Sequence, residues 1–342
     1  EPAGNGQFTN NDYIYIAIRR PDGYVGKPPE LGTDVFAMDT GASTSANTIP
    51  DLDSSFPVDL ALIKNLTQSQ DWHIGTRLQG TKKLNTNLSA SESTSSNQVW
   101  DSNLGCWKNL GSEYQGWMWK RHAGFTVCIW EGDGVIGRQI PHDMNKIPEM
   151  IWLKKRTGTA RNWPVYHKGL NGGSSPENYV VWLNLTNAES AAVEPWNDTA
   201  PTSTHFTIKG TANDPNTNED GEDYIAMLFA SVNGISKCGF YDADSNGVTV
   251  NCGFQPRFLI IKLANVAGDN DNWSNWAVFD SVRGFSSGND KMLRIDTTAA
   301  EFTTSNFGEF TSTGFTLNHG FYTTNSTNIS GTSGKYIYYA HA

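Results

Sequence analysis

The sequence predicts an all-β protein of tandem β-sandwich-like (jelly-roll-like) domains. Three observations predict this fold. Short runs of alternating apolar and polar residues are separated by Gly, Asn and Asp turns, a pattern typical of half-buried strands. Aromatic residues make up 12% of the chain and charged residues only 18%, so there is ample apolar surface to bury. Finally, the same motifs recur at intervals of roughly a small domain.

The first repeated motif is a strand that begins with Tyr or with Asp-Tyr or Lys-Tyr. Its four tyrosines follow one another at intervals of 101, 110 and 112 residues. The four copies span residues 12–17, 114–119, 223–228 and 335–340. Because the copies alternate in polarity and are rich in aromatic and β-branched residues, we expect each to end a repeated unit as a β-strand.

The second repeated motif is a proline followed by an apolar run that ends in lysine. It spans residues 57–64, 148–154 and 256–262, and each copy is followed by a tryptophan: Trp72, Trp163 and Trp276. A hairpin-like stretch precedes each proline after the first, at 125–140 and 235–254, and 34–39 takes this place in the first unit. Gly and Asn in these turns supply the positive φ that tight hairpins need.

The repeats divide the chain into three units and one extra strand. The predicted units span 21–123, 124–232 and 233–342, and each is long enough to bury its own core. The segment 1–20 contains the strand at Tyr13, which resembles the last strand of a unit but has no unit before it. We expect either that the chain begins inside a longer protein or that this strand completes the sheet of another unit.

Three local features are predicted outside the repeats. The best helix candidate is 187–194, ended by Pro195. The acidic segment 213–222 is expected to be a long surface loop. Cys238 and Cys252 flank a turn, where a disulfide is geometrically possible, although two buried thiols are the favoured interpretation.

Charge and hydropathy limit the partners. The net charge is −10, and basic residues occur at most as short clusters, so no patch suited to nucleic-acid phosphates is expected. The longest apolar runs, 224–232 and 258–261, are too short to span a bilayer, which predicts no membrane insertion.

Metal binding is not expected, although the sequence leaves calcium binding open. Residues 242–247 (DADSNG) match the first half of an EF-hand loop, but Gly253 stands where the bidentate Glu should be. A hairpin turn is the favoured interpretation. Acidic loops at 268–272 and 219–223 could also hold calcium, but solvated loops are favoured there.

No catalytic residues are predicted. The seven histidines fit no metal-protease pattern, and no GxSxG motif is present. A glycosidase would need two carboxylates in one cleft, and the sequence selects no such pair. Moreover, Asp280 of the third unit aligns with His167 of the second, so this position is not kept acidic.

Aromatic residues are the remaining lead to a ligand. The tryptophans that match between units are expected in the core. Trp273 lies in an insertion of the third unit, so it is expected to be exposed and is the one candidate for stacking on a ligand such as a sugar ring.

Several segments resemble repeats in virion structural proteins of marine tailed phages. The resembling segments are 13–21, 33–39, 56–59, 132–142, 148–152, 196–204 and 334–342, so the resemblance extends over nearly the whole length of the chain. The chain departs from the resemblance at the acidic loop 213–222 and at the insertion 268–275. The matching segments fall on predicted strands and turns, so the resemblance carries over no catalytic residue.

This resemblance implies a non-enzymatic virion protein, part of a tail fibre or similar appendage that contacts the host surface. Other virion proteins and a host surface glycan are the partners it implies, and a homotrimer is expected because such fibres are usually trimeric. Two alternatives remain: a capsid decoration or carbohydrate-binding protein, and a tailspike that depolymerises polysaccharide.

Overall fold

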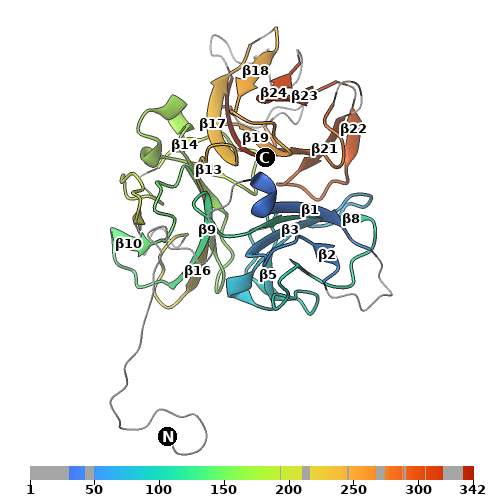
Figure 1. Ribbon diagram of the computed structural model, residues 1–342. Helices are drawn as coiled ribbons and strands as arrows, with labels where there is room; N and C mark the ends of the chain where they lie inside the picture. Colours follow the sequence, from blue (N-terminus) through green and yellow to red (C-terminus); the bar gives the residue numbers. More distant parts are fainter. Residues whose placement is uncertain are drawn as a thin grey trace, which may run out of the picture.

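The alternating segments form three six-stranded antiparallel sheets, which confirms the all-β, sandwich-like prediction (Figure 1). The computed structural model describes residues 31–42, 50–192, 194–209, 216–244, 246–266, 274–286, 288, 290–304, 306–318 and 334–342. The predicted strand at Tyr13 therefore lies outside the described residues. No helix in the described ranges is long and apolar enough to cross a membrane.

Unit 1 comprises the first eight strands. They are β1 (Phe36–Thr40), β2 (Leu52–Asp53), β3 (Leu60–Asn65), β4 (His73–Thr76), β5 (Lys82–Leu84), β6 (Ser93–Thr94), β7 (Gly105–Cys106) and β8 (Tyr114–Trp119). The large sheet has the order β1-β8-β3-β4-β5-β6, and β2 pairs with β7 in a small sheet.

Unit 2 repeats this topology. Its strands are β9 (Phe125–Glu131), β10 (Arg138–Pro141), β11 (Met150–Lys155), β12 (Pro164–His167), β13 (Tyr179–Trp182), β14 (Ser190–Ala191), β15 (His205–Ile208) and β16 (Asp223–Phe229). The large sheet runs β9-β16-β11-β12-β13-β14, and β10 pairs with β15.

Unit 3 adds one strand to the small sheet. Its strands are β17 (Ser236–Asp242), β18 (Val248–Asn251), β19 (Phe258–Leu263), β20 (Ala277–Asp280), β21 (Asp290–Arg294), β22 (Phe302–Thr304), β23 (Gly308–Thr311), β24 (Gly314–Leu317) and β25 (Lys335–His341). The large sheet runs β17-β25-β19-β20-β21-β22, and the small one β18-β24-β23. Short 3-10 turns are the helical elements of the described chain: η1 (Gly32–Asp34), η2 (Arg77–Gln79), η3 (Leu170–Gly173) and η4 (Pro176–Asn178).

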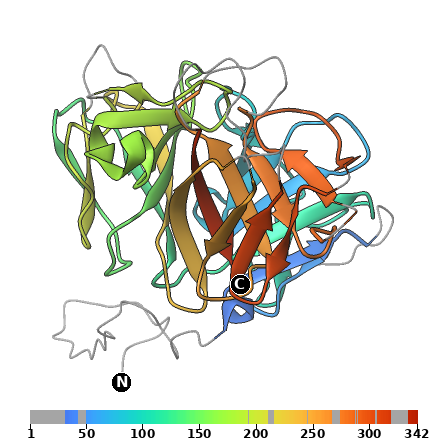
Figure 2. The ribbon, with the colours of Figure 1, turned by 90° about the horizontal axis from the view of Figure 1, so that it is seen from above.

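Strand alternation gives each large sheet two buried faces. In β16, Ile225, Met227 and Phe229 join a central core shared by all three units. Tyr224 and Leu228, on the opposite face, pack under the small sheet of unit 2. The other units have their own outer cores in the same way. The inner faces of three sheets thus pack against one another, and each outer face is covered by its own small sheet (Figures 1 and 2).

Equivalent hydrogen bonds join the three units in a ring. Backbone N–H groups of Glu92, Glu189 and Glu301 donate to carbonyls of the next unit. The acceptors are Arg156 at 2.8 Å, Ala264 at 2.6 Å and Leu66 at 2.8 Å, each two residues beyond the lysine of the proline motif. Because the third bond runs from unit 3 back to unit 1, the ring is closed.

The tryptophan of the second motif strengthens each junction. Trp163 Nε1 donates to Asn85 O of unit 1 at 3.2 Å, and Trp276 Nε1 to Trp182 O of unit 2 at 2.9 Å. Trp72 Nε1 completes the set at Arg294 O of unit 3, at 2.8 Å. These three carbonyls lie at equivalent register positions after β5 and at the ends of β13 and β21. The matched tryptophans are therefore core residues that also join neighbouring units.

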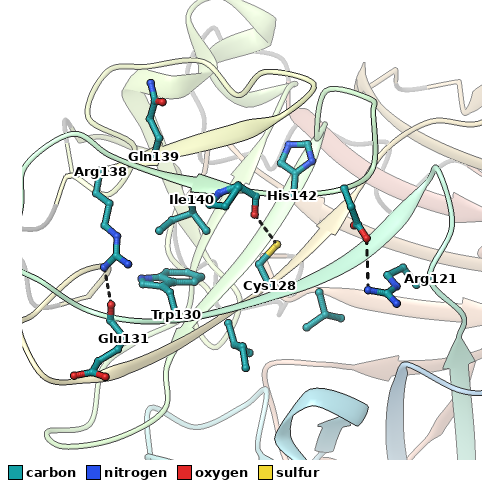
Figure 3. A pocket seen from close by; sticks show the side chains of 12 residues that line it. Arg121, Cys128, Trp130, Glu131, Arg138, Gln139, Ile140 and His142 are labelled. Carbon is teal, nitrogen blue, oxygen red and sulfur yellow. Dashed lines mark hydrogen bonds and ion pairs between the residues drawn. The ribbon is translucent and has the colours of Figure 1, made fainter. Parts of the chain in front are cut away.

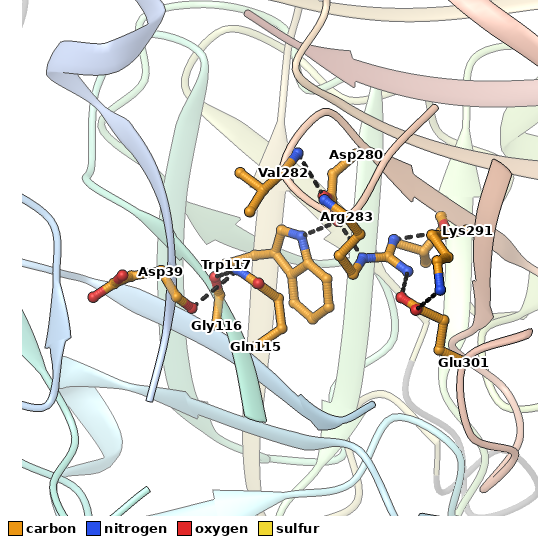
Figure 4. A network of polar contacts seen from close by, with 10 residues as sticks. Asp39, Gln115, Gly116, Trp117, Asp280, Val282, Arg283, Lys291 and Glu301 are labelled. Carbon is orange, nitrogen blue, oxygen red and sulfur yellow. Dashed lines mark hydrogen bonds and ion pairs between the residues drawn. The ribbon is translucent and has the colours of Figure 1, made fainter. Parts of the chain in front are cut away.

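A buried charged network lies where unit 3 meets unit 1 (Figure 4). The Asp280 carboxylate accepts hydrogen bonds from Arg283 Nε at 2.6 Å and from Trp117 Nε1 of unit 1 at 3.0 Å. Arg283 also pairs with Glu301 at 3.0 Å, and Glu301 pairs with Lys291 at 3.1 Å. Asp280 and Arg283 are almost fully buried, so both charges are compensated within the protein.

Two local predictions are wrong. Instead of a helix at 187–194, Ser190 and Ala191 pair with β13 as the edge strand β14, and Glu189 bonds to Ala264 of unit 3. A helix this short is marginal by itself, so the sheet edge and the neighbouring unit provide better backbone partners. The described part of the loop 213–222, residues 216–222, is also not a free surface excursion throughout, because Thr217 and Asn218 are fully buried.

Candidate binding groove

An open groove of about 680 Å³ runs along the first strand of unit 2 (Figure 3). Its walls are β9, the edge strand of the large sheet, and β10, the edge strand of the small sheet. The groove therefore lies on one side of the unit 2 sandwich, between the edge of the large sheet and the edge of the small sheet. Residues 127–131 and 138–143, together with Arg121, line it.

The floor of the groove is apolar. Trp130 stacks on Tyr224 with ring centroids 5.6 Å apart, and Ile140 packs in the same outer core. Cys128 Sγ lies 3.6 Å from Pro141 O, and burial raises the pKa of this thiol to about 12. Cys128 is consequently a protonated, weakly reactive group and is suited to packing rather than to nucleophilic chemistry.

The rim of the groove is polar, and its two arginines are each paired with an aspartate. Arg138 Nη1 donates to the carbonyl oxygen of Glu131 at 2.6 Å and lies 3.3 Å from the Asp133 carboxylate. At the other end, Arg121 and Asp143 form an ion pair of 3.5 Å. Paired charges around an apolar floor can orient an extended chain but do not create a site for a free anion.

His142 is a second titratable group that lines the groove. Its Nε2 lies 3.1 Å from Thr202 O and donates there, which fixes Nδ1 as an acceptor. Burial is the main cause that lowers the pKa of His142, so the ring is neutral at pH 7. A neutral ring with no carboxylate bonded to it among the described residues offers no relay for acid–base catalysis.

The edge of β9 supplies hydrogen-bonding groups to the groove. Gly132 N bonds to Glu222 O and Ala230 N to Gly124 O, so the even-numbered residues of β9 point their backbone groups at β16. The N–H and C=O groups of Val127 and Ile129 therefore point to the open side. Such a strand edge is the feature that binds extended peptides by β-sheet addition.

The predicted ligand residue Trp273 lies outside the described residues. All the tryptophans that the structure describes are buried except Trp182, which is half-buried. None of those described thus presents a free stacking face.

The possible calcium loops have other partners. In the DADSNG turn, Asp244 Oδ1 accepts from Asn246 N at 2.9 Å, and Asp242 pairs with Lys335 at 2.8 Å. In the loop 219–223, Glu219 and Glu222 both pair with Lys155. The loop 268–272 lies outside the described residues. Across the described ranges, no group of three or more His, Cys, Asp or Glu is placed to hold a metal ion.

The four cysteines, which include Cys238 and Cys252, are free thiols. Burial is the main cause that raises the pKa of Cys252 to about 11 and that of Cys238 well above the ordinary value. The position shared by Asp280 and His167 is confirmed by register, since each lies opposite the first residue of the central strand. Thr76 holds this position in unit 1.

The sequence motifs did not point to the groove. It lies beside the hairpin-like stretch 125–140, which was predicted only as a structural element. The signal that could have found it is the apolar alternation of β9, which continues to an exposed Ile129 at 44% exposure.

A closed ring of three sheet units, with a groove along one open strand edge, defines a repeat-built β-protein. The chain belongs to a family described as a domain of unknown function, DUF7483, whose model matches residues 33–342. No curated protein and no solved structure matches the chain.

Proposed function

We propose that the chain is a non-enzymatic structural protein of a phage virion, part of a tail fibre or similar appendage that contacts the host surface. The observation that carries this proposal is the closed ring of three equivalent units. A virion appendage has to resist unfolding and proteolysis outside the cell. A ring supports this because each unit is held by two neighbours instead of one.

The use of the buried reactive groups also favours a structural role. Asp280, Arg283 and Glu301 satisfy one another, and His167 Nε2 lies 3.1 Å from Tyr338 O of the next unit. Carboxylates and imidazoles tied into unit junctions stabilise the ring and are shielded from a substrate. The resemblance to phage virion proteins also favours a structural role.

Other virion proteins and a host surface glycan are the partners we propose, and the virion is the proposed location. A homotrimer would place three rings around a fibre axis. Light scattering distinguishes a homotrimer from a monomer directly, because one chain has a mass of 37.6 kDa. A single mass of 37.6 kDa at micromolar concentration would contradict the trimer without affecting the structural role.

The virion location is tested on purified particles. Antibodies against the chain should label one end of the particle in electron microscopy, and the chain should remain with particles through a density gradient. Labelling of the capsid would favour the decoration alternative. Absence of the chain from washed particles would overturn the proposal.

The enzymatic and glycan-binding alternatives are tested in solution. Incubation with host surface polysaccharide should release no new reducing ends, and release of oligosaccharides would favour the depolymerase. If glycan recognition depends on Trp273, binding on a glycan array should be lost in Trp273→Ala. Equal binding by this variant and the parent would remove the stacking hypothesis.

A further inference from the structure

The groove along β9 has a counterpart in unit 3, where a loop of the preceding unit packs against the equivalent side chain. Register places Ile129 of β9 and Phe240 of β17 at equivalent positions, opposite Ile225 and Ile337 of their respective partner strands. Both side chains are about half exposed, at 44% and 47%. The difference between the two sites lies in what the preceding unit places beside them.

Beside Phe240, a loop of unit 2 packs closely. A Cβ atom on Gly169 would come within 2.6 Å of Phe240 Cβ, and one on Gly173 within 2.9 Å of the Phe240 ring. This loop is the long connection 168–178 between β12 and β13. The corresponding connection in unit 1, between β4 and β5, is only 77–81, so a shorter segment is available to cover Ile129.

The chain contains a strand-forming segment that its described sheets do not use. Residues 12–18 (DYIYIAI) repeat the pattern of β16 (DYIAMLF) and of β25. Strands of this type pair antiparallel with the first strand of each unit: β8 with β1, β16 with β9, and β25 with β17. The segment therefore carries the residue pattern of a strand that can pair with a first strand, although in the described units such strands pair with its opposite edge.

The described chain begins beside unit 3, within reach of the groove. Residue 31 lies four residues before Val35, whose carbonyl accepts a 2.9 Å hydrogen bond from Lys120 N. The next residue, Arg121, lines the groove. A connection from 19 to 30 can span roughly 40 Å when extended, so residues 12–18 can reach the whole length of β9.

We propose that residues 12–18 of the same chain dock in this groove and add a strand to the free edge of β9. The backbone groups of Val127 and Ile129 would pair with the added strand. Apolar side chains of the segment would cover Ile129 on the inner face and Cys128 and Trp130 on the outer face. Docking would also protect an edge that otherwise favours aggregation.

Disulfide trapping tests the proposal on the full chain. In a Cys128→Ser background, the pair Tyr15→Cys and Ile129→Cys should form an intrachain disulfide under mild oxidation. The matched control is Tyr15→Cys with Phe240→Cys, at the equivalent position of unit 3, where the loop 168–178 packs. A docked strand raises the effective concentration of its thiol, so we expect the first pair to close at least about tenfold faster.

Equal rates for the two pairs, or disulfides that link two chains instead of one, would overturn the proposal. Hydrogen exchange of the unmodified protein gives an independent readout. Amides of 12–18 should be protected in the parent and should lose protection in the double variant Ile14→Asp/Ile16→Asp. Unprotected exchange of this segment in the parent would also contradict docking.

Discussion

The indole Nε1 of Trp72 donates a 2.8 Å hydrogen bond to the carbonyl oxygen of Arg294, across 222 residues of sequence. This bond belongs to the junction between units 3 and 1, which no direct chain connection bridges in the described residues. Its two equivalents join units that follow each other in the chain. The Trp72–Arg294 contact is therefore one of the contacts that close the row of units into a ring, together with the Glu301–Leu66 backbone bond.

Replacing Trp72 with Phe should destabilise the protein by about 1–3 kcal/mol, because Arg294 O loses its shortest hydrogen bond and keeps only the longer ones from Thr297. Urea unfolding followed by circular dichroism measures the change. Trp152→Phe is the matched control, since Trp152 is equally buried but its Nε1 has no partner among the described residues. Equal losses in both variants would mean that the junction hydrogen bond contributes nothing beyond packing.

Lys154 predicts a rise of stability with pH. Its Nζ is buried and donates to Ser89 O of unit 1 at 2.7 Å, and burial lowers its pKa from 10.5 to about 7. Between these values the unfolded chain binds more protons than the folded one, so the free energy of unfolding increases as pH rises. The slope from this group is at most about 1.4 kcal/mol per pH unit.

The test compares the parent with Lys154→Met from pH 7 to 9.5. The difference in unfolding free energy, parent minus variant, should grow with pH, because the other titrating groups are common to both proteins. A constant difference would show that the backbone carbonyls keep this lysine charged in the folded state.

His167 predicts a loss of stability in acid. It is fully buried, and burial is the main cause that lowers its pKa from 6.5 to about 4. Between pH 6.5 and 4, the unfolded chain therefore binds a proton at this histidine that the folded chain does not bind. The free energy of unfolding consequently falls as pH falls through this window. The melting temperature of His167→Gln should depend less steeply on pH than that of the parent. Parallel pH profiles would contradict this assignment.

The Asp280–Arg283 pair predicts strong coupling at the unit 3–unit 1 junction. Arg283→Met should cost about 3–5 kcal/mol, because it leaves a buried carboxylate without its cation. The double variant Asp280→Asn/Arg283→Met should recover more than half of this loss, which urea unfolding can measure. Independent, additive losses would indicate that the two groups do not stabilise each other.

Much of the fold follows from sequence because strand alternation and repeated motifs are local signals. The proline motifs became the central strands β3, β11 and β19, and the tyrosine motifs became β8, β16 and β25, their direct neighbours. The short segment 187–194 was misjudged because Ala264, whose carbonyl binds Glu189 N, is distant in sequence.

Ring closure and the groove were not predictable for the same physical reason. No local sequence pattern indicates that Trp72 will contact Arg294. In the sequence, a tryptophan that packs only in the core of its own unit cannot be distinguished from one that also donates a hydrogen bond to the neighbouring unit. The groove depends on the difference in length between the connections 77–81 and 168–178, which matters only once the units are side by side. Trp273, the one candidate taken from sequence, stays a prediction.

Hydrogen exchange measured in increasing urea tests the central claim, that the three units form one closed body. The slowest amides of β3, β11 and β19 should exchange with one common free energy of opening, and Trp72→Phe should lower all three equally. If β11 of unit 2 kept its protection while β3 and β19 lost theirs, the units would be independent domains, and the closed-ring account would be contradicted.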